Sequence, residues 1–367
     1  MNNRISILVK PTNACNLRCH YCFHEKTGYS QEIMSNELFD EMISKISCEY
    51  DNINIVWHGG EPLLVPLAFY ESAYKFCSCK NSNIKYSIQT NATLLSDDFL
   101  NFFKENDTNI GVSFDGTVNE LQRGSTEIVI KKILQARKSG FNLGAIMVVT
   151  KNNINRLKDE YDYFKKLGIS VKFNPMFTDG AGTHHRELEV SVDDYIEAFT
   201  DFFKYWLQDT NCNINAITCH EYIKLILYNR AGVCTYNSCL GNWLCIDASG
   251  DIYPCDRLAV SDFRLGNIRS IDKISDVFMS ENFINLIKNS ISRRNSCSST
   301  CEYYSMCYGG CNASAALGGN ISQNTNISCR MHKGIISGIQ EVVEKIPTYS
   351  EDIVNPILKK IISQNQG

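Results

Sequence analysis

Six short apolar runs alternate with amphipathic stretches over the first half of the chain. The apolar runs predict strands at residues 5–10, 53–58, 85–89, 110–114, 145–150 and 171–173. The amphipathic stretches predict helices at residues 36–46, 66–76, 97–104, 127–139 and 155–167. Strands that alternate with helices in this way favour parallel strands joined by crossover helices. We therefore expect an α/β fold, as a closed or partly closed barrel or as a doubly wound sheet, because periodicity does not distinguish these.

The second half of the chain is less regular. Residues 175–188 are rich in turn-forming residues and predict a linker. Ser191 begins a variant of the capping box, so a helix is predicted from there to about residue 208. Between residues 233 and 329 the periodic patterns break down, and we predict a small domain with little regular structure that needs its cysteines as staples. Two helices are predicted at residues 331–345 and 351–363.

Charge and hydropathy argue against two classes of partner. The chain has 36 basic and 40 acidic residues and a net charge of −4, which gives no basic footprint for nucleic acid. No apolar run approaches the roughly 18 residues that a membrane span needs. The N-terminal sequence MNNRISILVKPTNAC lacks the apolar region and cleavage site of a secretory signal. We therefore expect a cytoplasmic protein that binds neither nucleic acid nor membrane.

The number of cysteines limits the chemistry further. The chain of 367 residues holds 17 cysteines, an odd number, and no export signal precedes them. A framework of disulfide bonds is not expected, because disulfides are rare in reducing compartments. Abundant cysteine in such a chain indicates metal, and the spacings indicate which metal.

Three cysteines follow directly on the first predicted strand. Cys15, Cys19 and Cys22 form a C-x3-C-x2-C loop. Such a loop wraps three thiolates around one face of a cubane cluster and leaves the fourth iron open for a small molecule. Three cysteines are too few for a closed structural zinc site. The alternative is a zinc loop completed by His20 or His24.

The triad resembles the signature of the radical S-adenosylmethionine (SAM) superfamily, which has an aromatic residue before the last cysteine. The resemblance continues at the ends of the next three strands, in Gly59-Gly60-Glu61-Pro62, in Gln89-Thr90-Asn91 and in Ser113-Phe114-Asp115-Gly116. In the family these segments bind the amino group, carboxylate and ribose of SAM. The resemblance implies the cofactor-binding residues Tyr21, Gly59, Gly60, Glu61, Asn91 and Ser113, with Arg123 as a further contact to SAM or substrate.

The resemblance also implies a mechanism. A reduced [4Fe–4S] cluster donates one electron to SAM, and the sulfonium C–S bond breaks homolytically. The resulting 5′-deoxyadenosyl radical abstracts a hydrogen atom from the substrate. The chemistry belongs to the cofactors, and the protein supplies position and exclusion of water.

Eight cysteines in the C-terminal half form a second constellation. It resembles the SPASM extension of peptide-modifying radical SAM enzymes, although the first pair is C-x3-C where the family has C-x2-C. The resemblance implies two auxiliary [4Fe–4S] clusters with interleaved ligands. The first would take Cys234, Cys239, Cys255 and Cys311, and the second would take Cys297, Cys301, Cys307 and Cys329.

Two points in this array stay open. Cys245 is an alternative to Cys234, although its apolar neighbours favour a buried small residue. The whole array has a second explanation as two zinc knuckles. The other cysteines are interpreted as packing or surface thiols.

One carboxylate beside the array is a candidate catalytic residue. Asp256 follows Cys255 directly, and in the anaerobic sulfatase-maturating enzymes an aspartate at the matching position is proposed as the base that deprotonates the substrate residue. A carboxylate beside a cluster is expected to have the raised pKa that suits this role. The alternative is a loop carboxylate that caps nearby backbone N–H groups.

The resemblance covers residues 5 to about 330 and points to the group of anaerobic sulfatase-maturating enzymes and ribosomal-peptide maturases. It implies a peptide- or protein-modifying oxidoreductase with three [4Fe–4S] clusters and SAM. Maturation of a ribosomally made peptide, by a crosslink, a thioether or an oxidation, is placed slightly ahead, because sulfatase maturases commonly carry glutamine where His58 stands. The alternative is oxidation of a sulfatase cysteine or serine to formylglycine. An alternative of another class is a non-catalytic iron–sulfur electron carrier.

Partners and domain limits complete the expectations. The chain starts at the predicted barrel, so a peptide substrate would need a separate leader-binding protein or direct docking. A flavodoxin- or ferredoxin-type protein is expected as electron donor. The predicted divisions are a radical SAM barrel core at residues 1–185, a helical connection at 186–232, a SPASM domain at 233–335 and C-terminal helices at 336–367.

Overall fold

A single nine-stranded sheet runs through the molecule in the order β6-β5-β4-β3-β2-β1-β7-β8-β9. The computed structural model describes residues 4–24, 32–178, 180–229, 232–237, 239–319, 322 and 327–345. Six strands of the sheet are parallel neighbours in chain order. They are β1 (Arg4–Val9), β2 (Asn52–Trp57), β3 (Asn83–Thr90), β4 (Asn109–Ser113), β5 (Gly144–Val149) and β6 (Ser170–Pro175). All six predicted strands are thereby confirmed.

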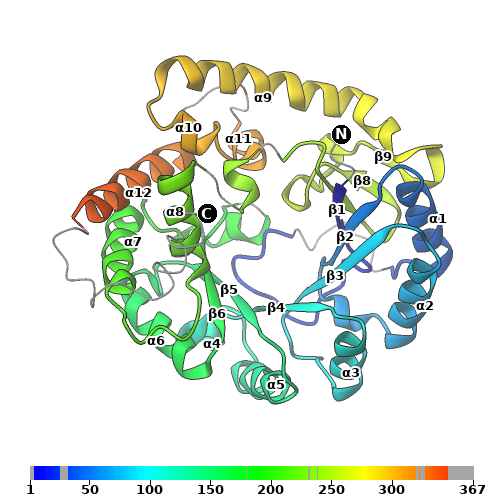
Figure 1. Cartoon of the computed structure of the whole chain (residues 1–367), viewed down its shortest axis with the longest axis horizontal. Coiled ribbons are helices and arrows are strands. Elements are labelled where there is room, and N and C mark those ends of the chain that lie inside the picture. Colours follow the sequence, from blue (N-terminus) through cyan, green and yellow to red (C-terminus); the bar gives the residue numbers. More distant parts are fainter. Residues whose placement is uncertain are drawn as a thin grey trace, which may run out of the picture.

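The strand order decides between the two predicted architectures. Because β1 to β6 follow one another without reversal, right-handed crossovers place every connecting helix on the same face of the sheet. A doubly wound sheet requires a reversal of strand order. Figure 1 shows the helices on the outside of a curved, open sheet. The fold is therefore a partial (β/α)6 barrel.

The crossover helices match the predicted ones within a few residues. They are α1 (Asn36–Ser47), α2 (Leu67–Ser78), α3 (Asp97–Glu105), α5 (Thr126–Lys138) and α6 (Leu157–Leu167), with the short α4 (Asn119–Gln122) before α5. Serine hydroxyls cap α1 and α3, where Ser35 accepts from the backbone N–H of Leu38 and Ser96 from that of Phe99. These caps explain why both helices begin where the chain leaves the preceding loop.

Apolar side chains fill the space between the parallel strands and these helices. Ile5, Ile7, Ile53 and Ile55 are fully buried on β1 and β2. Trp57 at the end of β2 is also fully buried, and it packs against aromatic rings of α1 and α2. Burial on this scale is the main favourable term in the folding of the barrel.

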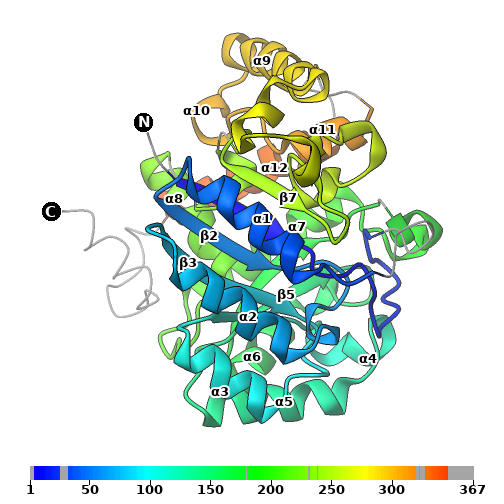
Figure 2. The same ribbon diagram turned by 90° about the vertical axis from the view of Figure 1, so that its right-hand side faces the viewer.

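Three helices cover the β6 side of the molecule. They are α7 (Val192–Leu207), α8 (Ile217–Tyr228) and α12 (Ile327–Glu344). The hydroxyl of Ser191 caps α7 as predicted. Helices α7 and α12 approach closely because Gly334 has no side chain, and a Cβ there would lie 2.3 Å from Cδ1 of Ile196. Figure 2 shows α7, α8 and α12 beyond the sheet. The sequence patterns did not predict α8.

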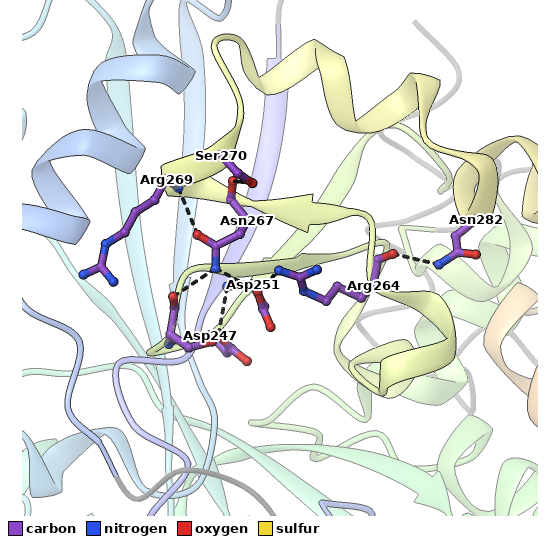
Figure 3. A network of polar contacts seen from close by, with 8 residues as sticks. Asp247, Asp251, Arg264, Asn267, Arg269, Ser270 and Asn282 are labelled. Carbon is purple, nitrogen blue, oxygen red and sulfur yellow. Dashed lines mark hydrogen bonds and ion pairs between the residues drawn. The ribbon is translucent and has the colours of Figure 1, made fainter.

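The cysteine-rich region adds three strands to the barrel sheet. Strand β7 (Trp243–Ile246) pairs in parallel with β1, and β8 (Asp251–Tyr253) and β9 (Gly266–Asn267) follow in antiparallel pairs. Their turns are fixed by the polar network of Figure 3, in which Asp251 accepts hydrogen bonds from Asn267 and Arg264, each at 2.7 Å. This network fixes the hairpin directly before Cys255.

The prediction of little regular structure between residues 233 and 329 was wrong for one long segment. Helix α9 (Glu281–Thr300) spans 20 residues and is followed by α10 (Tyr304–Cys307) and α11 (Asn312–Leu317). The buried stripe of α9 changes from apolar to polar along the helix, with Ser290, Arg293 and Cys297 continuing it. A search for apolar periodicity does not detect such a stripe.

Two predicted segments have other outcomes. The predicted linker holds short 3-10 turns at Gly180–His184 and Arg186–Leu188. The predicted helix at residues 351–363 lies outside the described residues. None of the described helices is both long and apolar enough to cross a membrane. The four predicted domain limits remain predictions.

Candidate active site and cluster-binding cysteines

The carboxyl ends of four parallel strands carry the predicted cofactor residues. Strand β1 leads into the cysteine loop at residues 15–22, β2 into residues 59–62, β3 into Asn91 and β4 into residues 113–116. Parallel neighbours in register end at the same edge of the sheet, so these segments lie side by side. This edge is where α/β barrels place their active sites.

Two glycines let the end of β2 lie directly against the chain that leads to Cys15. The backbone N–H of Gly60 donates to the carbonyl of Thr12 at 3.2 Å, and that of Glu61 donates to the carbonyl of Ala14 at 2.8 Å. A Cβ on Gly60 would lie 2.0 Å from the Ala14 oxygen. Gly59 has a φ of +111°, which other residues rarely adopt. The two glycines therefore position the cysteine loop.

The side chain of Glu61 is turned into the protein. It is 1% exposed, and its carboxylate accepts from the Thr90 hydroxyl at 2.6 Å and from the Asn91 backbone N–H at 2.7 Å. Burial raises the pKa of Glu61, and these hydrogen bonds oppose the rise. The carboxylate thus ties the end of β2 to the end of β3. Its predicted contact with SAM remains a prediction.

Asn91 and Ser113 have polar partners on neighbouring segments. The Asn91 amide donates to the Asn16 side chain at 2.9 Å, which connects the end of β3 to the cysteine loop. The Gln89 amide donates to the Ser113 hydroxyl at 2.9 Å across β3 and β4. Both predicted residues therefore lie at the strand edge.

Tyr21 and Arg123 belong to one buried group with Asp115. The Tyr21 hydroxyl donates to the Asp115 carboxylate, and the Arg123 guanidinium donates to the Tyr21 oxygen at 2.8 Å. Asp115 is fully buried and also accepts from Gln122 at 3.1 Å and from the Val148 backbone N–H at 2.9 Å. Burial raises the pKa of Tyr21 well above its usual value. Arg123 thus anchors the cysteine loop through Tyr21.

The N-terminal cysteine loop suits an open cluster. Cys15 is exposed, and Cys19 and Cys22 are half-buried. Two backbone hydrogen bonds connect this loop to other segments. The N–H of Ala181 donates to the Cys22 carbonyl at 2.7 Å, and the N–H of His20 donates to the Gln122 carbonyl at 3.2 Å. Three accessible thiols on a fixed backbone fit a cluster with one iron left open.

The first predicted C-terminal group of cysteines comes together in the structure. Burial and the neighbouring thiols of Cys311 and Cys239 raise the pKa of Cys234 to about 11. Burial and the same two thiols raise the pKa of Cys255 well above its usual value. Cys239 and Cys311 thus affect both Cys234 and Cys255, which fits four thiols that surround one cluster.

The second predicted group lines a pocket. Its walls include all four predicted cysteines, Cys297, Cys301, Cys307 and Cys329. Burial, followed by the other three thiols, raises the pKa of Cys307 to about 12. Gly309 and Gly310 follow with φ values of +81° and +71°, so the chain turns sharply beside the sulfur atoms. Four converging thiols around a space fit a fully ligated [4Fe–4S] cluster.

Cys245, the alternative to Cys234, lies elsewhere. It is fully buried in β7, where it packs with Tyr253 and Ala259. Its sulfur atom lies 4.0 Å from Asp256, and burial raises its pKa. This environment favours Cys234 in the first group.

Asp256 differs from the sequence expectation in its pKa. Burial is the largest single influence and would raise the pKa, but it is opposed by the charge and hydrogen bond of Lys10, whose Nζ lies 2.6 Å from Oδ1. Lys10, His24 and His58 together outweigh burial and hold the pKa of Asp256 well below its usual range. The expected rise is therefore corrected to a fall, because the sequence did not indicate that Lys10 reaches this site.

Several site residues were missed or were not placed by the sequence analysis. Lys10 and His58 directly follow the first two strands, Thr90 ends the third, and Asp115 lies two residues beyond the fourth, in a motif that was recognised only as a whole. Position at the end of a parallel strand is the signal that singles out all four.

Two family models match the chain in these regions. The radical SAM superfamily matches residues 9–164, and an iron–sulfur cluster-binding domain, SPASM, matches residues 234–307. The chain is a radical SAM enzyme with a C-terminal SPASM domain, and it uses [4Fe–4S] clusters and SAM.

Individual relatives narrow the class. The cysteine-type anaerobic sulfatase-maturating enzyme of Clostridium novyi (strain NT) is 28% identical over 355 residues, which cover 90% of this chain and 93% of the relative. The structure of native anSMEcpe with bound AdoMet and Kp18Cys peptide has a TM-score of 0.84 and 24% identity, over 94% of this chain and 99% of that chain. Streptococcus suis SuiB bound to precursor peptide SuiA has a TM-score of 0.64 and 17% identity, over 89% and 76% of the two chains. The protein is similar to these maturases over nearly its whole length.

Proposed function

We propose that this enzyme is an oxidoreductase that matures one residue of a peptide or protein by hydrogen-atom abstraction. The observation that carries the proposal is the meeting of the cysteine loop with the ends of β2, β3 and β4. An electron carrier has no use for the GGEP, QTN and SFDG segments at these strand ends, so the non-catalytic alternative is not favoured.

When bound, the reduced cluster and SAM supply a 5′-deoxyadenosyl radical that abstracts a hydrogen atom from the substrate. The chain's own residues shape and fix the binding site for SAM and the cluster. Gly59 and Gly60 bring backbone polar groups beside the cysteine loop, and Glu61 fixes the strand ends that flank it. Arg123 and Tyr21 hold the loop from the other side.

Ligand roles are part of the proposal. Cys15, Cys19 and Cys22 would hold the SAM-binding cluster. The first auxiliary cluster would take Cys234, Cys239, Cys255 and Cys311, and the second would take Cys297, Cys301, Cys307 and Cys329. The convergence of each set of four thiols supports these two assignments.

The first candidate substrate is a ribosomally made peptide. His58, where sulfatase maturases commonly carry glutamine, contacts Asp256 beside the first auxiliary group, so the surroundings of the substrate differ from theirs. The complex of SuiB with a precursor peptide supports the same class. A separate leader-binding protein and a flavodoxin- or ferredoxin-type donor belong to this proposal. A cytoplasmic location remains a prediction from the sequence.

The second candidate is a sulfatase. The named similarity to a cysteine-type sulfatase-maturating enzyme over nearly the whole of both chains favours it. In that case the enzyme would oxidise a cysteine or serine to formylglycine.

One anaerobic experiment tests the function and separates the candidates. Reconstituted enzyme, SAM and a strong reductant are mixed with a Cys-x-Pro-x-Arg peptide, and 5′-deoxyadenosine and the peptide mass are followed. An aldehyde product with 5′-deoxyadenosine establishes a sulfatase-type maturase. Formation of 5′-deoxyadenosine without peptide change directs the search to short peptides encoded nearby. Absence of 5′-deoxyadenosine in cluster-loaded enzyme contradicts the proposal and restores the electron carrier.

A further inference from the structure

One buried amide in the cysteine-rich region donates a hydrogen bond to a predicted cluster ligand. The amide nitrogen of Asn312 lies 3.6 Å from Sγ of Cys239, a distance that suits sulfur because sulfur is larger than oxygen. Asn312 is the first residue of α11, directly after Cys311, and it is 2% exposed. Cys239 and Cys311 both belong to the first auxiliary group. The amide therefore lies directly beside the atoms that would hold the first auxiliary cluster.

Two donors on α9 determine which end of the Asn312 amide faces the sulfur atom. Oδ1 of Asn312 accepts from the Ser290 hydroxyl at 2.7 Å and from the Arg293 guanidinium at 2.6 Å. Both neighbours are donors, so the amide oxygen faces α9 and the NH2 group faces Cys239. Figures 1 and 2 show α9 beside α11. The amide thus presents an N–H group, and not a lone pair, to the thiolate.

Arg293 is fixed between the two auxiliary groups. It is 1% exposed, and its Nε donates to the Gly309 carbonyl at 3.0 Å. A buried guanidinium requires negative charge nearby. The thiols that act on its charge come from both groups and are Cys297, Cys307 and Cys311. Ligated thiolates on both sides would therefore hold the charged Arg293 in place, and Arg293 in turn holds the Asn312 amide.

We propose that the Asn312 amide raises the reduction potential of the first auxiliary cluster through its hydrogen bond to Cys239, with Ser290 and Arg293 as positioning residues. Reduction adds one electron, taken from the reductant, and no bond breaks and no proton moves. The added charge spreads onto the ligating sulfur atoms, so an N–H donor stabilises the reduced state more than the oxidised state. This inference rests on the proposed function, which takes Cys239 as a cluster ligand.

The oxygen and the nitrogen of the Asn312 amide serve different purposes. The oxygen joins α11 to α9, because Ser290 and Arg293 both donate to it. The nitrogen is directed at Cys239. A purely structural role needs only the oxygen, whereas control of the potential needs the N–H group at the sulfur atom. The polar stripe of α9 therefore has a reason beyond packing, since it orients an amide that the cluster uses.

The test compares both auxiliary clusters in one full-length chain. Alanine at Cys15, Cys19 and Cys22 removes the SAM-binding cluster and should leave about eight irons per chain. Anaerobic redox titration monitored by electron paramagnetic resonance should then show two one-electron waves. Lys333→Gln identifies the wave of the second group, because Lys333 lines the pocket formed by those cysteines and its positive charge favours reduction.

We expect Asn312→Leu to lower the midpoint potential of the other wave by about 59 mV, which is a tenfold lower equilibrium constant for one-electron reduction. Ser290→Ala should lower it less, because Arg293 still orients the amide. Asn282→Leu is the matched control on α9, since the Asn282 amide donates to a backbone carbonyl, and it should leave both waves unchanged. An unchanged potential in Asn312→Leu, or a shift of the wave that Lys333→Gln also moves, would overturn the proposal.

A second measurement needs no substitution at Asn312 and does not respond to a merely structural role. The same chain is prepared with 15N only in the side-chain amide of asparagine, and the reduced clusters are studied by pulsed electron paramagnetic resonance. We expect a 15N hyperfine coupling to the first auxiliary cluster, because the Asn312 nitrogen contacts a ligating sulfur atom. Absence of this coupling contradicts the proposal even where Asn312→Leu does not fold.

The inference and the proposed function fail in different ways. Fewer than two waves, or iron well below eight per chain, would contradict the cluster ligands of the proposed function and would overturn the inference with them. Two waves that Asn312→Leu leaves unmoved would leave the clusters and the proposed function standing and refute the role of Asn312 alone. No arm of the test requires a peptide substrate.

Discussion

The barrel and the cysteine-rich region bury different kinds of side chain. In the barrel, β1 and β2 place Ile5, Ile7, Ile53 and Ile55 at 0% exposure against the helices. In the cysteine-rich region, the buried positions of α9 include Arg293, which donates to Asn312 at 2.6 Å and to the Gly309 carbonyl at 3.0 Å. The first region is held by apolar burial, whereas the second depends on hydrogen bonds and on what its thiols bind.

Because of this difference, loss of a cluster should affect catalysis in one region and folding stability in the other. A barrel that is stable through its apolar core tolerates the loss of its cluster, because the ligands lie on a surface loop. A region whose interior is polar and thiol-lined gains folding free energy from metal binding itself. Loss of a cluster-binding cysteine should therefore abolish SAM cleavage in the barrel without unfolding it, whereas it should unfold the cysteine-rich region.

The largest effect is expected at the N-terminal cysteine loop. Cys22→Ala should lower SAM cleavage by about 1000-fold or more, an activation free energy of about 4 kcal/mol, because one of three ligands is gone. The free energy of unfolding of the barrel should stay unchanged. Cys48→Ala, an exposed cysteine outside the predicted ligands, is the control. Loss of barrel stability in Cys22→Ala would break the comparison.

The next effect concerns the first auxiliary group. Cys234→Ala should remove about four irons per chain and expose residues 233–345 to proteolysis, because metal binding contributes to folding there. Cys245→Ala is the matched control and should keep its iron, since Cys245 packs against Tyr253 and Ala259 in β7. Iron analysis and limited proteolysis under anaerobic conditions measure both. Iron loss in Cys245→Ala instead would reverse the ligand assignment.

Truncation of a core side chain in the barrel should lower the stability of the protein without changing its iron content. Ile55→Ala should lower the free energy of unfolding by roughly 2–5 kcal/mol, because a fully buried side chain leaves a cavity. Ile128→Ala, at a side chain that is 49% exposed, should change it by less than about 0.5 kcal/mol. Iron content should be equal in both variants. Denaturant unfolding monitored by circular dichroism checks the difference.

The same contrast explains what the sequence could predict. The barrel strands were predicted because their buried residues are apolar at regular spacing, and the cysteine groups were predicted by resemblance of their spacing. Helix α9 was not predicted because Ser290 and Arg293 occupy buried positions where apolar residues are expected. The partners of Asp256 were not predicted because Lys10, His24 and His58 are brought close to it only by the fold. A pKa depends on such partners and not on the adjacent sequence.

The smallest expected effect is a pH dependence of stability at the boundary between the barrel and the cysteine-rich region. His332 on α12 hydrogen-bonds the Tyr236 hydroxyl at 2.8 Å, and burial lowers its pKa to about 4. Below the unfolded-state pKa of about 6.5, the unfolded chain binds a proton that the folded chain refuses, so stability falls as the pH falls from about 6.5 towards 4. Between pH 7.5 and 6.0 the wild type should lose about 1 kcal/mol more than His332→Gln in anaerobic urea unfolding. Equal losses in the two proteins would mean that His332 is already charged, and that the packing of α12 on this part of the molecule admits water.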